Sequence, residues 1–326
     1  MAGWGPLTAV LFLFSSPLFA ASLFNPRYDG ALLSAMDQTF RMDYAKAEST
    51  VTQLPFDAPE RPYFAGLACV SRFQDLGDTA ALRRGENFWN KLVESPRSFH
   101  GDSAQVLLYR GLAALQLSYV ASIRGSTFRA ASMAWTARGL LLPIAGRPEA
   151  DAGLALFDYY REHVLEKIRF LPFVNPNADL PFQRLEAAVN NSRYLHDGLR
   201  VSVFWIHVDR KETDSALKIV DAFLMRYPNN RLARQMRGSA LYRGGRLNEA
   251  RLVYEGLLPE YTALKTTSPN FPAIGYSSSV GNLARIYFGL GMKAQAGARL
   301  AEWRALCRSG LEPWLPTSLK KDLEKF

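Results

Sequence analysis

Acidic and imidazole side chains gather on one predicted helix face near the middle of the chain. Asp158, Glu162 and Glu166 are spaced four residues apart, and His163 lies beside them. Side chains at this spacing share one face of a helix, and carboxylates with an imidazole can ligate a divalent metal ion. The same residues also fit a solvated acidic face that forms ion pairs with neighbouring basic residues, namely Arg161, Lys167 and Arg169. We expect the second arrangement, with no metal site and no cofactor.

The other reactive residue types do not form a catalytic set. The sequence contains no GxSxG elbow, Walker loop, HExxH pair or CxxC pair. His207 lies in the apolar run VFWIHV, where a histidine whose polar atoms are satisfied within the core is the expected role. The His100 and His196 side chains fall in predicted turns. We therefore expect a protein that is not an enzyme.

Cys69 and Cys307 are the only two cysteines, which is too few for a disulfide framework or a cysteine-based zinc site. Both lie among apolar residues and resemble small buried residues of a helix face. In an oxidising compartment they could pair. Because they would sit at opposite ends of an extended array, we expect two thiols.

A basic segment lies in the second half of the chain. The range 226–251 contains seven arginines against one acidic residue, Glu249, and the net charge of the whole chain is +9. Arg231, Arg234 and Arg237 are spaced three residues apart, along one side of a helix. This stripe could bind an anionic partner through charge-assisted contacts. It also fits a solvated face whose arginine stems cover apolar surface.

The elements that position these residues must form a globular fold. Hydrophobic residues make up 48% of the 326 residues and charged residues 21%, which excludes a disordered chain. Residues 1–22 carry no charged side chain and combine a short apolar run, Leu7–Phe14, with Pro17 and the small residues at 20–22. This layout predicts a signal peptide over 1–21, although no basic residue precedes the apolar run. We therefore expect an exported protein, periplasmic or secreted, with no transmembrane segment in the mature chain.

Helical periodicity is strongest in the second half of the chain. The segment 216–228 has apolar residues on one helical face and ends at Pro228. The next two segments, 231–243 and 246–258, show the same pattern and are separated by Gly244 and Gly245. Short turns between amphipathic helices predict antiparallel helix pairs.

The spacing of small residues indicates a repeat. Ala216 and Ala250 are 34 residues apart, Gly238 precedes Ala250 by twelve, and Tyr254 follows it by four. These offsets, with a closing Pro228, resemble the tetratricopeptide repeat. Small residues on paired helices let the helices approach closely, so we expect Gly238 to face Ala250.

The resemblance extends along the chain with less regular spacing. We expect an all-α, right-handed superhelical solenoid of about seven antiparallel helix pairs, with a repeat domain over 22–308 and its best-formed repeats over 195–258. The pairs are expected at 29–54, 60–94, 102–145, 149–192, 195–227, 230–258 and 272–307. A proline-rich loop is expected at 171–182, an insertion at 259–272, and a C-terminal capping segment at 309–326.

Two further segments, ADAGLALFDYY at 150–160 and RYLHDGLRV at 193–201, resemble a bacterial class of exported tetratricopeptide proteins. The resemblance implies a solenoid that binds other molecules and does not specify which. We expect a non-enzymatic scaffold of the cell envelope that binds a protein or peptide partner on its concave face. The alternative is a binding module for an anionic envelope polymer or lipid, through the arginine-rich segment 226–251. A nucleic-acid partner is not expected of an exported protein.

In tetratricopeptide repeats the first helix of each pair lines the concave groove. Repeats that begin near Asp197, Arg231 and Ser277 would place five side chains in that groove, namely Trp205, Gln235, Tyr242, Arg243 and Arg285. The aromatic rings would supply rigid apolar area, and the arginines would hold a carboxylate. Trp205 equally fits a core position within FWIHV.

Overall fold

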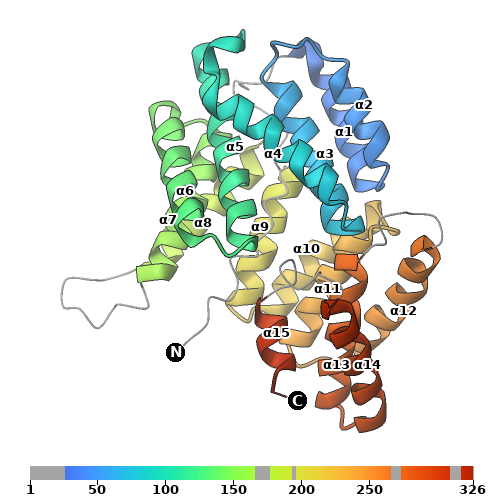
Figure 1. Ribbon diagram of the computed structural model, residues 1–326. Coiled ribbons are helices and arrows are strands. Elements are labelled where there is room, and N and C mark those ends of the chain that lie inside the picture. The colour runs from blue at the N-terminus through green and yellow to red at the C-terminus, as the bar shows by residue number, and fades with distance from the viewer. Residues whose placement is uncertain (1–25, 166–176, 193–195, 266–272, 309–316, 326) are drawn as a thin grey trace.

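A computed structural model describes residues 26–165, 177–192, 196–265, 273–308 and 317–325. These residues form α-helices, three short 3-10 helices and no strand (Figure 1). The predicted signal peptide at 1–21, the first half of the proline-rich loop, the end of the insertion and the first part of the capping segment lie outside the described residues.

The helices come in antiparallel pairs, as the sequence predicts, and all seven expected pairs are present. The first four pairs are α1 (Asp29–Phe40) with α2 (Tyr44–Thr52), α3 (Glu60–Leu76) with α4 (Thr79–Glu94), α5 (Ser103–Ile123) with α6 (Thr127–Leu141), and α7 (Pro148–Leu165) with α8 (Asp179–Asn191). The other three are α9 (His196–Asp209) with α10 (Thr213–Arg226), α11 (Arg231–Arg243) with α12 (Leu247–Lys265), and α13 (Ala273–Gly289) with α14 (Lys293–Leu306). A last short helix, α15 (Thr317–Leu323), packs against α13.

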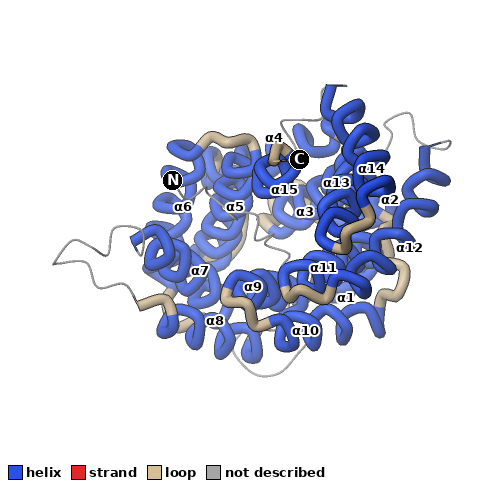
Figure 2. Tube along the Cα trace, turned by 90° about the horizontal axis from the view of Figure 1, so that it is seen from below, coloured by secondary structure: helices blue, strands red, loops and turns tan. Residues whose placement is uncertain are grey.

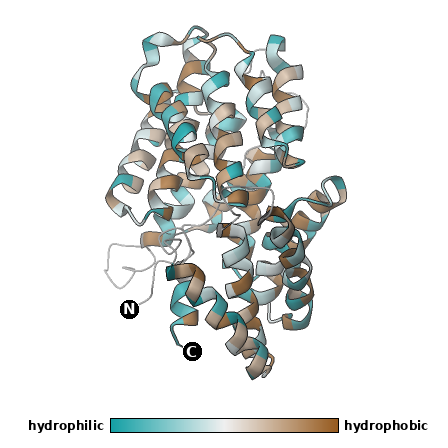
Figure 3. Ribbon diagram, turned by 45° about the vertical axis from the view of Figure 1, so that its right-hand side comes forward, coloured by the Kyte–Doolittle hydropathy of each residue, from teal (hydrophilic) through white to brown (hydrophobic). Residues whose placement is uncertain are grey.

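Local sequence signals set many of the helix ends. The Asp78 side chain accepts a hydrogen bond from the Ala81 backbone N–H at 2.9 Å, and Asn230 caps α11 in the same way through the Ala233 N–H at 2.8 Å. Such side chains satisfy amide groups that have no partner within the helix. Gly77 ends α3 with a φ of 70°, a conformation that glycine adopts without strain. Figure 3 shows polar and apolar positions interleaved along the helices, as amphipathic packing requires.

One helix end differs from the prediction. The chain was expected to leave the helix at Leu258, yet α12 continues through Pro259 to Lys265. A proline inside a helix removes one backbone hydrogen bond. Here Leu258 and Tyr261 are 8% and 0% exposed, so the apolar face remains buried on both sides of Pro259. Burial of that face outweighs the local cost, and the expected insertion at 259–272 begins with helix.

The close approach of α11 and α12 involves a tyrosine. Gly238 lies against the ring of Tyr254, and a Cβ added at Gly238 would come within 2.7 Å of that ring. Ala250 is fully buried in the same core. The small residue therefore makes room for the Tyr254 ring, and the contact of Gly238 with Ala250 stays a prediction.

The solenoid curves until its first helices meet its last ones. Figure 2 shows the array from below, with the helices arranged around a curve. The C-terminal end of α1 reaches α10 and the start of α11, where Phe40 contacts Phe223 and Asn230. Helix α3 contacts both α11 and α13, far along the sequence. Cys69 of α3 and Cys307 are both present as thiols, as expected. The two cysteines do not lie at opposite ends of an extended array, because the curved array brings α3 against α11 and α13.

The core consists of two apolar clusters. One is built mainly from α1–α9, and the other from α9–α15. Within the described ranges, α5 is the helix long and apolar enough to cross a membrane by length and composition, and 61% of its apolar window is buried inside the protein. Figure 1 shows α5 within the bundle, between α4 and α6.

Candidate functional site

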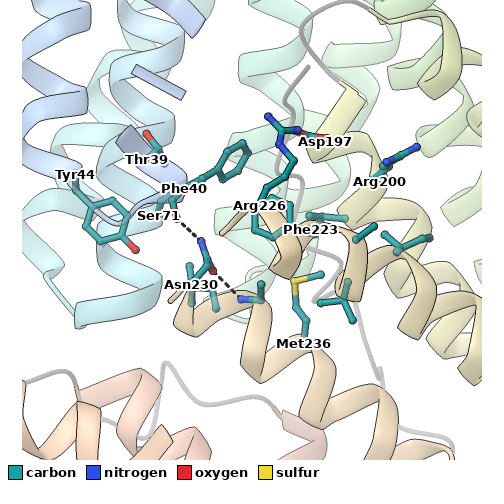
Figure 4. A pocket seen from close by; sticks show the side chains of 16 residues that line it. Thr39, Phe40, Tyr44, Ser71, Asp197, Arg200, Phe223, Arg226, Asn230 and Met236 are labelled. Carbon is teal, nitrogen blue, oxygen red and sulfur yellow. Dashed lines mark hydrogen bonds and ion pairs between the residues drawn. The ribbon is translucent and has the colours of Figure 1, made fainter. Parts of the chain in front are cut away.

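The contact between α1 and the α10–α11 segment is built around Phe40, at the C-terminal end of α1. Its ring packs edge-on against Phe223 of α10, with centroids 4.9 Å apart, and lies 5.1 Å from the ring of Tyr227. The Asn230 side chain donates a hydrogen bond to the Phe40 carbonyl at 2.8 Å (Figure 4). Asn230 thus caps α11 with its oxygen and holds α1 with its nitrogen.

A buried ion pair reinforces this junction. The Arg231 guanidinium donates two hydrogen bonds to Asp75 of α3, one of them from Nε to Oδ1 at 3.0 Å. The Tyr44 and Tyr261 hydroxyls donate to the same carboxylate at 3.2 and 3.5 Å. Burial raises the pKa of the Asp75 carboxyl, while its contacts with Arg231 and the two tyrosines act in the opposite direction. We call this set, Tyr44, Asp75, Arg231 and Tyr261, the clasp.

A pocket lies beside the clasp, where α1, α2 and α3 meet α9, α10 and α11 (Figure 4). Its volume is about 60 Å³, room for a few water molecules or one aliphatic side chain. Apolar side chains form most of its wall, namely Phe40, Val201, Ile219, Val220, Phe223, Leu232, Ala233 and Met236. The pocket therefore suits an apolar group of a ligand, which would be transferred from water into it.

Charged groups line the same pocket. Arg226 donates to Asp197 at 2.9 Å, so these two charges balance each other. Arg200 of α9 is half-buried and has no hydrogen-bond or ion-pair partner among the residues that the structure describes. Its cationic group is consequently available to an anionic group bound beside the apolar wall.

Three of the five predicted groove residues come together elsewhere. Tyr242, Arg243 and Arg285 line one open hollow with Leu247 and Phe288. The Arg285 guanidinium lies 4.1 Å from the centroid of the Tyr242 ring and pairs with Asp322 of α15 at 3.1 Å. Arg243 pairs with Asp209 at 2.8 Å. Both arginines thus already hold a carboxylate of this chain, and this weakens the hollow as an anion site.

The other two predicted groove residues do not join that hollow. Gln235 donates a hydrogen bond to the Tyr261 hydroxyl and so extends the clasp. Trp205 packs against Phe204, with ring centroids 5.0 Å apart, and belongs to the margin of the second core cluster. Its buried indole N–H has no hydrogen-bond partner among the described residues. The five residues therefore do not all line that hollow, and their common role in a groove stays a prediction.

The basic stripe is engaged within the protein. Arg231 belongs to the clasp, and Arg234 pairs with Glu260. Arg237 pairs with Asp221 at 2.8 Å. The sequence of 226–251 indicates an excess of positive charge. The acidic partners of these three arginines lie on other helices, outside that range.

The acidic cluster on α7 takes the ion-paired arrangement. Asp158 lies 3.2 Å from both Arg161 and Arg184, and Glu162 pairs with Arg161 at 2.6 Å. Glu162 also accepts a hydrogen bond from the Asn177 backbone, and its pKa is lowered because contacts with Arg161 and Asn177 outweigh burial. Glu166 lies outside the described residues. Across the described ranges, no three His, Cys, Asp or Glu side chains are grouped to hold a metal ion.

His207 is a satisfied core residue, as its apolar neighbours predicted. It is 9% exposed, and its Nδ1 lies 2.6 Å from Glu212 Oε2. Its ring also packs edge-on against Phe182, with centroids 5.2 Å apart.

Sequence reasoning missed the pocket because its two sides are far apart in the chain. Phe40 and Tyr44 meet Phe223 and Asn230 across more than 180 residues of sequence. The tetratricopeptide register describes how neighbouring repeats pack, and it carries no signal for a contact of the first two helix pairs with the fifth and sixth. The single usable signal was Arg200, a charged residue within the apolar helix pattern of 199–208.

No protein-family model matches the sequence, and no curated protein matches it. Among solved structures, the chain is similar to a human IFIT1 dimer with PPP-AAAA at 11% identity and a TM-score of 0.37, covering 83% of this chain and 66% of that one. A human IFIT1 dimer with m7Gppp-AAAA gives 12% identity and a TM-score of 0.38, covering 86% and 69%. The chain thus spans about two thirds of the length of the IFIT1 chain. Similarity at this level says nothing about what this chain binds.

Proposed function

We propose that this protein is a non-enzymatic binding protein whose helical solenoid holds a peptide segment of a partner protein. The observation that carries the proposal is the pocket beside the clasp, which has an apolar wall and Arg200, a cation with no acidic partner among the described residues. Helical repeat proteins present such surfaces between elements that are themselves rigidly packed.

The pocket chemistry specifies the kind of segment. A volume of about 60 Å³ accepts one aliphatic side chain and excludes a large aromatic one. Arg200 would bind a carboxylate next to that side chain, either an Asp or Glu residue or the C-terminus of a peptide. The ligand is therefore an extended peptide with an aliphatic residue beside an acidic group.

The other polar groups of the pocket have structural roles. Asn230 holds α1 and caps α11, and Asp197 pairs with Arg226. We assign no reaction to them, and the proposed role is binding alone.

We also propose that the protein acts outside the cytoplasm, as a scaffold of the cell envelope. The uncharged apolar segment at the start of the chain supports this proposal, as does the resemblance of 150–160 and 193–201 to exported tetratricopeptide proteins. The alternative function, binding of an anionic polymer through Arg231, Arg234 and Arg237, has less support because each of these arginines pairs with an acidic residue of the same chain.

Peptide binding can be measured by fluorescence anisotropy with pooled, labelled hexapeptides. The probes carry Val, Leu or Ile beside a free carboxylate, and a second pool carries the corresponding amides. We expect the carboxylate pool to bind, Arg200→Gln to weaken it about tenfold or more, and Ala222→Phe to abolish it by filling the pocket.

Leu252→Ser is the matched control, because Leu252 is 61% exposed on α12 and does not line the pocket. It should bind like the wild type. The double variant Tyr242→Ala/Arg243→Ala tests the second hollow in the same assay. Loss of binding in that variant alone would assign the peptide site to the second hollow. Equal binding by wild type and Arg200→Gln would reject the pocket beside the clasp as the peptide site.

A further inference from the structure

Helix α6 carries large apolar side chains on its solvent face. Phe128, Trp135 and Leu142 are 88%, 56% and 50% exposed. They are spaced seven residues apart, close to two helical turns, so they follow one line along α6 and the short helix η3 (Leu142–Ile144) that continues it. We call these three residues the α6 stripe.

The stripe is not a by-product of poor packing. Helix α6 packs against α5 and α7 through its opposite face, where Ala130, Ala137 and Leu141 are buried. Figure 1 shows α6 on the outside of the bundle. A contiguous line of exposed aromatic and aliphatic side chains on a soluble surface typically marks an interaction site.

The charged residues of α6 itself are both arginines, Arg129 and Arg138. Residues 103–148 contain five arginines and no acidic residue. Arg124 pairs with Glu86, but Arg129 is exposed and has no ion-pair partner among the described residues. Arg138 has no described ion-pair partner either, and its guanidinium lies 5.8 Å from the ring centroid of Trp135.

We propose that the α6 stripe docks on the surface of an anionic lipid bilayer. Phe128, Trp135 and Leu142 would enter the headgroup region, and Arg129 and Arg138 would contact lipid phosphates. Aromatic and aliphatic side chains on one helix face, flanked by arginines, are the composition of helices that lie in a membrane interface. The complementary charge selects anionic over neutral lipid.

This surface differs from the basic stripe on α11 in two respects. Arg231, Arg234 and Arg237 are held by acidic side chains of this chain, whereas Arg129 and Arg138 have no acidic partner among the described residues. The α6 surface also has exposed apolar side chains that can leave water, namely Phe128, Trp135 and Leu142. Lipid contact is thus assigned to α6, and it does not depend on the peptide pocket.

Sedimentation with sucrose-loaded vesicles tests the proposal on the full chain. The probes are phosphatidylcholine vesicles with and without about 30% phosphatidylglycerol. The anionic lipid gives the vesicles a negative surface potential. The apolar segment before residue 22 can add binding of its own, so the measured quantity is the ratio of binding to anionic and neutral vesicles. We expect the wild-type ratio to exceed about ten.

Three variants separate the contributions. Arg129→Gln/Arg138→Gln should bring the ratio close to one, because the preference for anionic vesicles comes from these two charges. Phe128→Ser/Leu142→Ser should reduce binding to anionic vesicles at least about tenfold. It keeps Trp135, whose ring packs edge-on against Phe157 of α7 with centroids 4.9 Å apart. Met225→Ser/Leu252→Ser is the matched control, since these residues are 81% and 61% exposed on other helices.

The expected result is loss of anionic-vesicle binding in both α6 variants, with unchanged circular dichroism, and wild-type behaviour of the control. A wild-type ratio near one would overturn the proposal and would make an acidic protein the better candidate for this surface. Equal losses in the control and in the α6 variants would overturn it too, because binding would then not depend on the stripe.

Discussion

Replacement of Arg231 by methionine tests the closure of the solenoid. The Asp75 carboxylate is 0% exposed and the Arg231 side chain 16% exposed, so Arg231→Met leaves a buried charge without its counter-ion. Removing one partner of a buried ion pair costs about 3–5 kcal/mol, because the remaining charge cannot regain water. The hydroxyls of Tyr44 and Tyr261 still donate to Asp75, which places the expected loss near the lower end.

The assay is urea unfolding followed by circular dichroism, compared with a matched variant in the same helix. Arg237 pairs with Asp221, but their side chains are 31% and 49% exposed. Exposed pairs contribute about 0–1 kcal/mol, so Arg237→Met should change the unfolding free energy by no more than that.

The double variant Asp75→Leu/Arg231→Met separates charge from packing. It removes both charges and should recover most of the stability that Arg231→Met loses. X-ray scattering should also show a larger radius of gyration for the folded Arg231→Met protein, because the clasp holds α3 against α11. Equal effects of Arg231→Met and Arg237→Met, or a loss below about 1 kcal/mol, would refute the buried pair.

Three further predictions concern packing, thiol reactivity and processing. Gly238→Ala should destabilise the protein by about 1–3 kcal/mol, while Gly297→Ala, whose added Cβ meets nothing within 4 Å, should be neutral or slightly stabilising in thermal unfolding. Burial raises the pKa of Cys69 to about 12, so at pH 8 a thiol reagent should modify Cys307 first and Cys69 only after denaturation; equal rates in the native protein would contradict this. N-terminal sequencing from the native host should start at residue 21 or 22, and an intact start on most of the protein would reject export.

Local physics made the helix pairs predictable. The apolar period of each segment and the turn residues between segments, such as Gly77 and Asn230, act within a few residues of sequence. The end of α12 was missed because Pro259 is a local stop signal that burial of Tyr261 overrides. A local stop signal therefore fails where burial of the residues on both sides of it contributes more free energy than the signal costs.

The candidate site depended on contacts that no local pattern encodes. Asp75 and Arg231 are 156 residues apart, and each looks like an ordinary surface charge in its own helix. Their pairing follows from the curvature of the whole array, which sums small rotations between repeats. The arginine stripe looked unpaired in sequence because its acidic partners lie on other helices, Asp75 on α3, Asp221 on α10 and Glu260 on α12.

The central claim is that the pocket beside the clasp holds a segment of a partner protein. A photo-crosslinking amino acid placed at Met236 tests it in the native host, because Met236 lines the pocket and is partly exposed. Position 225, where Met225 is 81% exposed outside the pocket, is the control. We predict a discrete adduct with one protein from position 236, lost when Arg200→Gln is added. No adduct from position 236, or the same adduct from position 225, would contradict the claim.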